Sequence, residues 1–176
     1  MDQKKLEQAA RLIIEAVGED PEREGLLETP RRFAEMVAEQ LAYAAVPNEE
    51  IARAFDKTFS SPESDMVVVK DISLFSHCEH HIALMYNMKA AVGYIPRGRV
   101  IGLSKIARIA DAVSKRLQIQ ERIGADIRDI MERITGAGDV IVLLEGEHSC
   151  MTARGIRKPG TLTRTISASG RFRTDG

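Results

Sequence analysis

The chain has no tryptophan, and only 5% of its 176 residues are aromatic, so a hydrophobic core has to be built from aliphatic side chains. No apolar run approaches the about 18 residues that cross a bilayer, which argues against a membrane-spanning helix. The polar start, Met1-Asp2-Gln3-Lys4-Lys5, also differs from a secretory signal peptide, so we expect a cytoplasmic protein. A chain of this length can bury about 70% of its unfolded surface, enough for one domain without disulfide bonds.

Glycine-rich phosphate loops are missing as well. Neither G-x-G-x-x-G nor G-x-x-x-x-G-K-[ST] occurs, so side chains and a helix end would have to hold the phosphates of any bound nucleotide. The net charge is −1, which argues against a broad nucleic-acid surface. Six basic residues and no acidic one nevertheless lie between Met151 and Thr174. This segment is either a local site for a compact anion or a solvated basic face.

The apolar pattern changes from helical to extended spacing along the chain. Helical spacing predicts helices over Lys4–Val17, from Thr29-Pro30 to about Ala44, over Ser104–Leu117 and over Glu121–Ile134. Extended stretches predict strands over Met66–Phe75, Ile82–Ile95, Asp139–Glu145 and Thr161–Ser169. Paired strands followed by paired helices indicate an α+β fold with an antiparallel sheet. We expect a helical extension over residues 1–60 and a catalytic domain over residues 61–176.

All cysteine and histidine residues lie in two short segments, His77-Cys78-Glu79-His80-His81 and His148-Ser149-Cys150. Thiolate and imidazole are preferred ligands of Zn²⁺, and Cys78 and His81 are spaced to converge on one ion. Cys150 is the remaining thiol. Two cysteines and one histidine would leave the fourth position to water, whose pKa a catalytic zinc lowers to about 7. His80 and His148 would then be general acid or base candidates.

A closed structural site is the alternative, in which His148 joins Cys78, His81 and Cys150 around the ion. Spacing alone does not separate the two kinds of site. A Cys78–Cys150 disulfide would account for the thiols, but a reducing cytosol disfavours it, and it does not explain why every imidazole lies beside them. We expect His77 to be a bystander, and Glu79 either supports the site or is solvated.

Several longer motifs occur in the order found in one known family. They are Glu28-Thr29-Pro30-Arg31-Arg32, Cys78-Glu79-His80-His81, Gly93-Tyr94-Ile95-Pro96, Val100–Arg108, Leu117–Arg122 and His148–Gly155. Over about residues 22–172 the chain resembles GTP cyclohydrolase I. The resemblance favours the catalytic zinc. It implies that GTP and water are converted to formate and 7,8-dihydroneopterin triphosphate, the first step of tetrahydrofolate or pterin biosynthesis.

The resemblance also implies roles for single residues. Cys78, His81 and Cys150 would hold Zn²⁺, and His80 and His148 would transfer protons. Glu121, assisted by Gln120, would read guanine, because one carboxylate can accept from N1–H and the exocyclic amine together. The residues implied in triphosphate binding are Ser104, Lys105, Arg108, Arg154 and Arg32.

The fold that the resemblance implies is the T-fold, an antiparallel sheet with paired helices on one face. Such chains form homodecamers of two pentameric rings, with active sites between subunits. Two features depart from the family pattern. Glu35 stands where many relatives have a phosphate-binding lysine. The stretch from Cys78 to Pro96 is one residue longer and lacks a central glycine, so we expect a β-bulge or altered turn within residues 84–88.

Two other functions stay open on the sequence. The chain could be a related T-fold enzyme that acts on another purine or pterin, although Glu121 and the triphosphate residues argue against this. It could also be a non-catalytic, zinc-stabilised oligomeric binding module. Metal removal separates the module from an enzyme, because loss of a structural ion should melt the protein, whereas loss of a catalytic ion should stop turnover and leave much of the fold.

Overall fold

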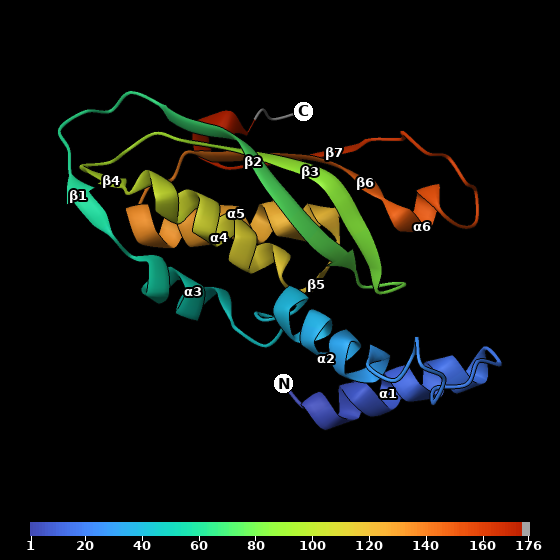
Figure 1. The fold of residues 1–176 in the computed structure, drawn as a ribbon. Helices are drawn as coiled ribbons and strands as arrows, with labels where there is room; N and C mark the ends of the chain where they lie inside the picture. The colour runs from blue at the N-terminus through green and yellow to red at the C-terminus, as the bar shows by residue number, and fades with distance from the viewer. Residues whose placement is uncertain (174–176) are drawn as a thin grey trace. The chain divides into compact units, whose positions relative to one another are not determined.

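The computed structural model describes residues 1–173, and residues 174–176, at the end of the expected catalytic domain and of the basic segment, lie outside the described part (Figure 1). The chain forms two compact units, residues 1–42 and the part from Tyr43 onward. By packing, residues 43–60 therefore lie in the larger unit. That the catalytic domain begins at residue 61 concerns function, which packing does not test, so this boundary stays a prediction.

The N-terminal unit is a pair of helices, α1 (Gln3–Ala16) and α2 (Thr29–Gln40), drawn in blue in Figure 1. The Asp2 carboxylate caps α1 by accepting from the Lys5 N–H at 3.1 Å. Pro30 lies in the first turn of α2, where its missing N–H costs no helical bond. Both helices were predicted, but the second ends at Gln40, and the apolar residues that follow it lie in turns.

The larger unit contains the sheet. Its elements are α3 (Asn48–Phe55), β1 (Thr58–Ser60), β2 (Val67–Cys78), β3 (Ala83–Tyr94), β4 (Arg99–Ile101), α4 (Leu103–Ser114), β5 (Leu117–Gln118), α5 (Gln120–Thr135), β6 (Val140–His148), α6 (Ser149–Thr152), β7 (Thr163–Ala168) and a final 3₁₀ turn, Gly170–Phe172. β1 pairs with β4 in a two-stranded ribbon, and the main sheet has the order β5-β2-β3-β6-β7. The α+β class is confirmed.

The main sheet is mixed, which corrects the predicted antiparallel sheet. β2, β3, β6 and β7 pair antiparallel, but β5 runs parallel to the end of β2, with Leu117 and Gln118 beside His77 and Cys78. A two-residue strand is too short to carry an alternating pattern, so nothing in the sequence marks it as a strand. Its pairing brings the start of α5 next to the turn between β2 and β3.

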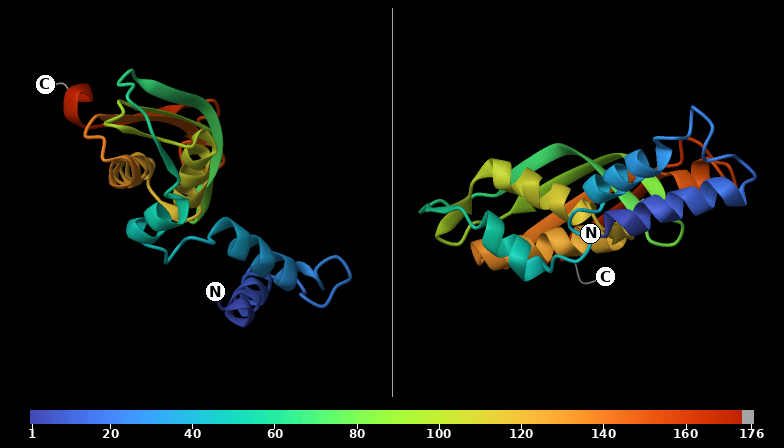
Figure 2. Two further views of the ribbon diagram at one scale, coloured as in Figure 1. Left: turned by 90° about the vertical axis from the view of Figure 1, so that its left-hand side faces the viewer. Right: turned by 60° about the horizontal axis from the view of Figure 1, so that its bottom comes forward.

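Helices α4 and α5 cover one face of the sheet (Figure 2). Side chains of this core are aliphatic, as the shortage of aromatic residues requires. Fully buried members include Ile106, Ile109, Val113, Ile123, Ile127, Ile130, Val92, Val142 and Leu144. Because successive strand residues point to opposite faces, the alternate residues lie on the other face, where Phe75, Leu84, Leu143 and Ile166 are exposed. In the described part, no helix is long and apolar enough to span a membrane.

The bulge expected near the middle of β3 is confirmed. The pairing of β3 with β6 shifts between Tyr86 and Lys89, and its pairing with β2 shifts at the same place. Asn87 has a φ of 50°, a left-handed conformation that asparagine tolerates better than most residues. The strand thus accommodates an extra residue and keeps its pairing with β2 and β6 on both sides of the bulge, with the register shifted by one residue across it.

The turn that follows β7 is hydrogen-bonded to Asp139, whose side chain is only 4% exposed. Its Oδ1 accepts from the Arg171 N–H at 2.8 Å, and its Oδ2 accepts from Arg171 Nε at 3.1 Å. The Arg171 backbone bond, followed by its guanidinium, lowers the pKa of Asp139. Gly170 has a φ of 53°, and a Cβ there would overlap the Asp139 carboxylate and the Gly138 carbonyl. The turn therefore depends on glycine for conformation and for space.

We predict that Gly170→Ala lowers the free energy of unfolding by clearly more than Gly98→Ala. Gly98 also has a positive φ, of 76°, but a Cβ there meets open space, so its replacement should cost only about 1–2 kcal/mol of backbone strain. Gly170→Ala adds the displacement of Asp139 to the same strain. Urea denaturation followed by circular dichroism measures both losses, and equal losses would contradict the role of Asp139.

Candidate metal centre

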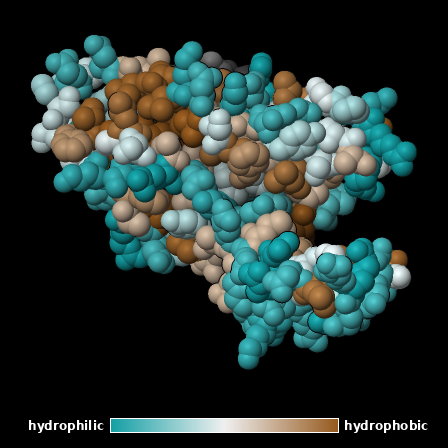
Figure 3. All heavy atoms as spheres, viewed as in Figure 1, coloured by the Kyte–Doolittle hydropathy of each residue, from teal (hydrophilic) through white to brown (hydrophobic). Residues whose placement is uncertain are grey.

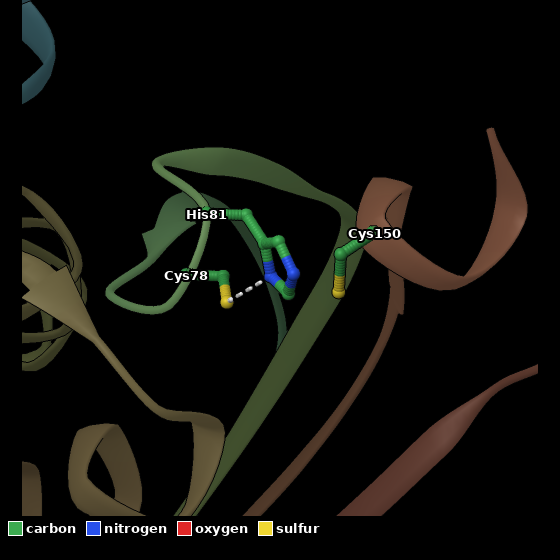
Figure 4. A group of neighbouring side chains, drawn as sticks. All are labelled: Cys78, His81 and Cys150. Carbon is green, nitrogen blue, oxygen red and sulfur yellow. Dashed lines mark hydrogen bonds between the residues drawn. The ribbon is translucent and has the colours of Figure 1, made fainter. Parts of the chain in front are cut away.

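The two segments that hold every cysteine and histidine meet at one end of the sheet. Cys78 ends β2, His81 lies in the turn before β3, and Cys150 lies in α6 directly after β6 (Figure 4). Strand pairing sets Met85 of β3 opposite His148 of β6, which brings the end of β6 to the β2–β3 turn. One donor atom from each of Cys78, His81 and Cys150 lies within 4.8 Å of the other two. The predicted convergence is confirmed, and metal binding by the three stays a prediction.

The donor set fits Zn²⁺. The imidazole of His81 lies between the two thiols in Figure 4, with Nδ1 3.9 Å from Cys78 Sγ. Both cysteines are free, so the alternative disulfide is not formed. Burial, and then the neighbouring Cys78, raise the pKa of the Cys150 thiol. A cation beside the Cys150 thiol would favour its thiolate form, and two thiolates with one imidazole leave one tetrahedral position for water.

His148 is not among the described residues whose donor atoms converge with those of Cys78, His81 and Cys150. Its Nε2 lies 2.9 Å from Gln120 Oε1. The Gln120 amide nitrogen donates to the carbonyls of Leu144 and Thr163, at 3.3 and 3.0 Å, so the oxygen must be the group that faces His148. His148 Nε2 therefore carries a proton. Burial lowers the pKa of His148, and the charge of Glu121 raises it in part.

A cavity of about 160 Å³ lies against this centre. Its walls are Cys78, His80, His81, Met85, Gln118, Ile119, Gln120, Glu121, His148 and Cys150. The expected proton-transfer residues, the expected guanine-reading residues and the three candidate ligands thus share one space. His80 stands close to the thiol of Cys78, at 3.8 Å from Nδ1 to Sγ. His77 is not among the residues that line the cavity, and its role as a bystander stays a prediction.

The residues expected to bind the triphosphate are not gathered in this cavity. Ser104, Lys105 and Arg108 lie in the first half of α4, whereas the last residue of that helix, Ser114, accepts from Ser76 near the end of β2. The helix is about 18 Å long, so the three residues lie toward its opposite end. Of the expected anion-binding group, Arg154 does reach the centre, where its Nη1 donates to His81 Nε2 at 3.0 Å.

Arg32 is exposed on α2 of the N-terminal unit. Its neighbour Arg31 donates to two carboxylates, Glu28 at 2.8 Å and Glu35 at 2.6 Å. The substitution noted at residue 35 therefore has a local consequence, because Glu35 engages Arg31. Among the two arginines of this motif, Arg32 is the better candidate for an anion.

Two polar side chains beside the centre were not assigned a role from the sequence. Arg122 donates to both oxygens of Glu79, at 2.7 and 3.1 Å, and so joins the β2–β3 turn to the first turn of α5. Gln118 is buried, and its amide nitrogen donates to Asp126 at 3.0 Å. Both lie in the motif Leu117–Arg122. The partner of Arg122 is 43 residues away in the chain, which no local pattern reveals, whereas that of Gln118 is eight residues away.

Comparison with known proteins gives one consistent family. A family model described as GTP cyclohydrolase I matches residues 6–176. The chain is 56% identical to proteins named GTP cyclohydrolase 1 from Clostridium botulinum (strain Kyoto / Type A2) and Clostridium acetobutylicum, and 55% identical to that of Clostridium beijerinckii. Each match covers 99% of this chain and 92% of the relative. A crystal structure of the archaeosine synthase QueF-Like is similar with a TM-score of 0.48 and 18% identity, over 62% of this chain and 96% of that one.

We predict that His81→Ala and Cys150→Ser abolish retention of Zn²⁺, whereas His148→Ala retains about one ion per chain. The first two variants remove a candidate ligand, and the third removes an imidazole that faces Gln120 instead. Metal content after dialysis, measured by atomic absorption, distinguishes them. Equal loss of zinc from His148→Ala and His81→Ala would favour the closed structural site.

Proposed function

The chain belongs to the GTP cyclohydrolase I family, and on that premise we propose that it is a zinc-dependent hydrolase that converts GTP and water to formate and 7,8-dihydroneopterin triphosphate. This reaction would be the first step of tetrahydrofolate or pterin biosynthesis, in the cytoplasm. The observation that carries the proposal is the Cys78, His81 and Cys150 group beside a cavity that two further histidines and Glu121 also line. We take the catalytic domain to be residues 61–176, with the T-fold.

Cys78, His81 and Cys150 would hold the ion. When bound, zinc lowers the pKa of water and so supplies a nucleophile near neutral pH for attack at C8 of guanine. If His81 binds the ion through Nδ1, the nitrogen that lies 3.9 Å from Cys78 Sγ, its proton would be on Nε2. Arg154, which can only donate, would then lose its acceptor on His81 and be free for an anion of the substrate.

Two histidines are placed to move protons at the reacting ring. C8 lies between N7 and N9, and protonation of N7 makes this carbon electrophilic. His148 reaches the cavity with Nε2 fixed by Gln120, which leaves the opposite nitrogen, Nδ1, to exchange a proton. The lowered pKa of His148 favours a neutral imidazole that can accept a proton and return it. His80, on the Cys78 side, is the second such group.

Guanine recognition would fall to the first turn of α5. Glu121 and Gln120 line the cavity there, and a carboxylate is favoured at a helix N-terminus. The two oxygens of Glu121 can accept from N1–H and the exocyclic amine of guanine, a pair of donors that adenine does not present. Gln120 is tied to β6 and β7 and would hold the turn against the base.

The phosphate groups need more cations than one chain places at the cavity. Arg154 is at hand, but Ser104, Lys105 and Arg108 lie toward the other end of α4. We propose that a homodecamer of two pentameric rings supplies these residues, together with Arg32, from neighbouring subunits. Exposed apolar side chains support assembly, and Figure 3 shows hydrophobic residues gathered over the start of β2 and the region near β4.

The direct test is incubation of the zinc-loaded protein with GTP, followed by assay of formate and fluorescence of oxidised neopterin. We expect both products from GTP and neither from ATP. His148→Ala should keep its zinc and lose turnover by about 10²–10⁴-fold, because general acid–base catalysis contributes about that factor. Formate release at the wild-type rate from this variant would contradict the role of His148. Formate release from another purine instead of GTP would favour the alternative of a related T-fold enzyme.

Removal of the metal tests the binding-module alternative in the same protein. A chelated enzyme should stop releasing formate, recover with Zn²⁺ and keep most of its secondary structure. A module stabilised by zinc should instead unfold when the metal is removed. Circular dichroism before and after chelation separates these results.

We predict that Glu121→Gln raises the KM for GTP by about 10–100-fold, because one acceptor becomes a donor that faces a donor, and bonds to charged groups contribute about 1.5–3 kcal/mol. Glu132→Gln is the matched control, since Glu132 lies on the same helix but does not line the cavity. Steady-state kinetics with GTP measures both. Equal KM values for the two variants would contradict guanine reading by Glu121.

A further inference from the structure

One carboxylate outside the proposed machinery joins three segments beside the metal centre. Glu147, near the end of β6, accepts from Asn87 Nδ2 at 2.9 Å with Oε1. Its Oε2 accepts from the Tyr86 hydroxyl at 3.2 Å and from the Gly160 N–H at 3.1 Å. The Tyr86 hydroxyl also lies 3.0 Å from Thr152 Oγ1, the last residue of α6. Since Tyr86 has one proton to give, Thr152 donates to Tyr86 while Tyr86 donates to Glu147.

This network depends on the bulge in β3. In a regular strand Tyr86 and Asn87 would point to opposite faces of the sheet. The register shift after Tyr86, with Asn87 at a φ of 50°, lets both side chains reach the same carboxylate. The extra residue noted in the sequence thus places two donors on Glu147.

Glu147 in turn holds the segment from Ala153 to Gly160, which we call the arginine loop. The loop is exposed along its whole length. The Lys158 N–H donates to the Met151 carbonyl at 2.9 Å, and the Gly160 N–H donates to Glu147. Arg154 extends from this loop to the centre. The direction of Arg154 therefore depends on a few anchors, of which Glu147 is the only charged one found in the described residues.

We propose that Glu147 is a positioning residue, which together with Tyr86 and Asn87 holds the arginine loop so that Arg154 meets the phosphate groups of the substrate. The inference rests on the proposed function, in which Arg154 binds the triphosphate. An anchored loop binds more tightly than a free one because fewer side chains and backbone bonds must be ordered on binding. Bonds from Asn87, then Gly160 and Tyr86, lower the pKa of Glu147 and keep it an anionic acceptor.

The test compares Glu147→Ala with Glu145→Ala. Glu145 lies two residues earlier on β6, hence on the same face, and binds Arg164 at 2.8 Å without touching the loop. We expect Glu147→Ala to raise the KM for GTP about five- to tenfold, with little change in kcat. The inhibition constant of guanosine, which has no phosphate, should stay unchanged. Glu145→Ala should match the wild type in both.

A second readout does not need turnover. Trypsin cleaves after Arg154 and Arg157 only when the loop can leave its anchors. We expect Glu147→Ala to be cleaved there several-fold faster than Glu145→Ala, at equal protease concentration. Asn87→Gly is a gentler variant, because glycine accepts the φ of 50° while the Nδ2 donor is lost. Asn87→Gly should raise the rate of cleavage and the KM for GTP, each by less than Glu147→Ala does. It takes the place of Glu147→Ala in the test if the Glu147→Ala protein fails to fold.

A double variant tests whether Glu147 acts through Arg154. With Arg154→Ala already present, Glu147→Ala should raise the KM for GTP no further. Additive increases would overturn the proposal, as would equal rises in the KM for GTP and the inhibition constant of guanosine. Unchanged trypsin cleavage would overturn it whatever the kinetics. A wild-type protein that releases no formate from GTP would instead overturn the proposed function, whereas normal release with an unchanged KM in Glu147→Ala would overturn the positioning role alone.

Discussion

The register of β3 between β2 and β6 is the constraint on which the candidate centre depends. Cys78 and His81 come from one end of the β2–β3 connection, and Cys150 follows the end of β6, so only strand pairing brings their donor atoms within 4.8 Å. A slip of one residue would turn every side chain of the strand to the other face. The aliphatic face buried under α4 and α5 opposes such a slip, because a slip would expose it. Packing of this core therefore also sets the positions of the candidate ligands at the end of the sheet.

The start of α5 is fixed to both sides of the same centre. Gln120 binds carbonyl oxygens at Leu144 and Thr163 and also faces His148. Arg122 donates two hydrogen bonds to the carboxylate of Glu79, which lies beside the candidate ligands. This ion pair is partly exposed and adds little to stability, but its fork geometry restricts the distance between the turn and the helix. Glu121 lies between these two attachments, so its position relative to the candidate metal ligands is fixed from both sides.

The sequence predicted the parts of this arrangement that have a local pattern. Apolar spacing located the long helices and the β2–β3 hairpin, and counting cysteines and histidines singled out the three donor residues. The bulge in β3 was also expected, because the stretch from Cys78 to Pro96 is one residue longer than the family pattern and lacks its central glycine. The parallel pairing of β5 and the bonds from Arg122 to Glu79 and from Gly160 to Glu147 were not predicted. Each joins residues that are far apart in the chain and individually look like ordinary surface or turn residues.

The uneven distribution of charge has a structural consequence. A triphosphate carries several negative charges, and the cavity wall already contains the carboxylate of Glu121. Arg154 cannot balance these charges alone, and a chain of net charge −1 supplies no general positive field. Lys105 and Arg108 lie near the start of α4, where free N–H groups favour anions, yet within the described residues neither lines the cavity beside the candidate metal ligands. The proposed assembly would bring these two groups of residues together, so on that proposal the charge of the substrate, more than the stability of the fold, would account for a site shared between subunits.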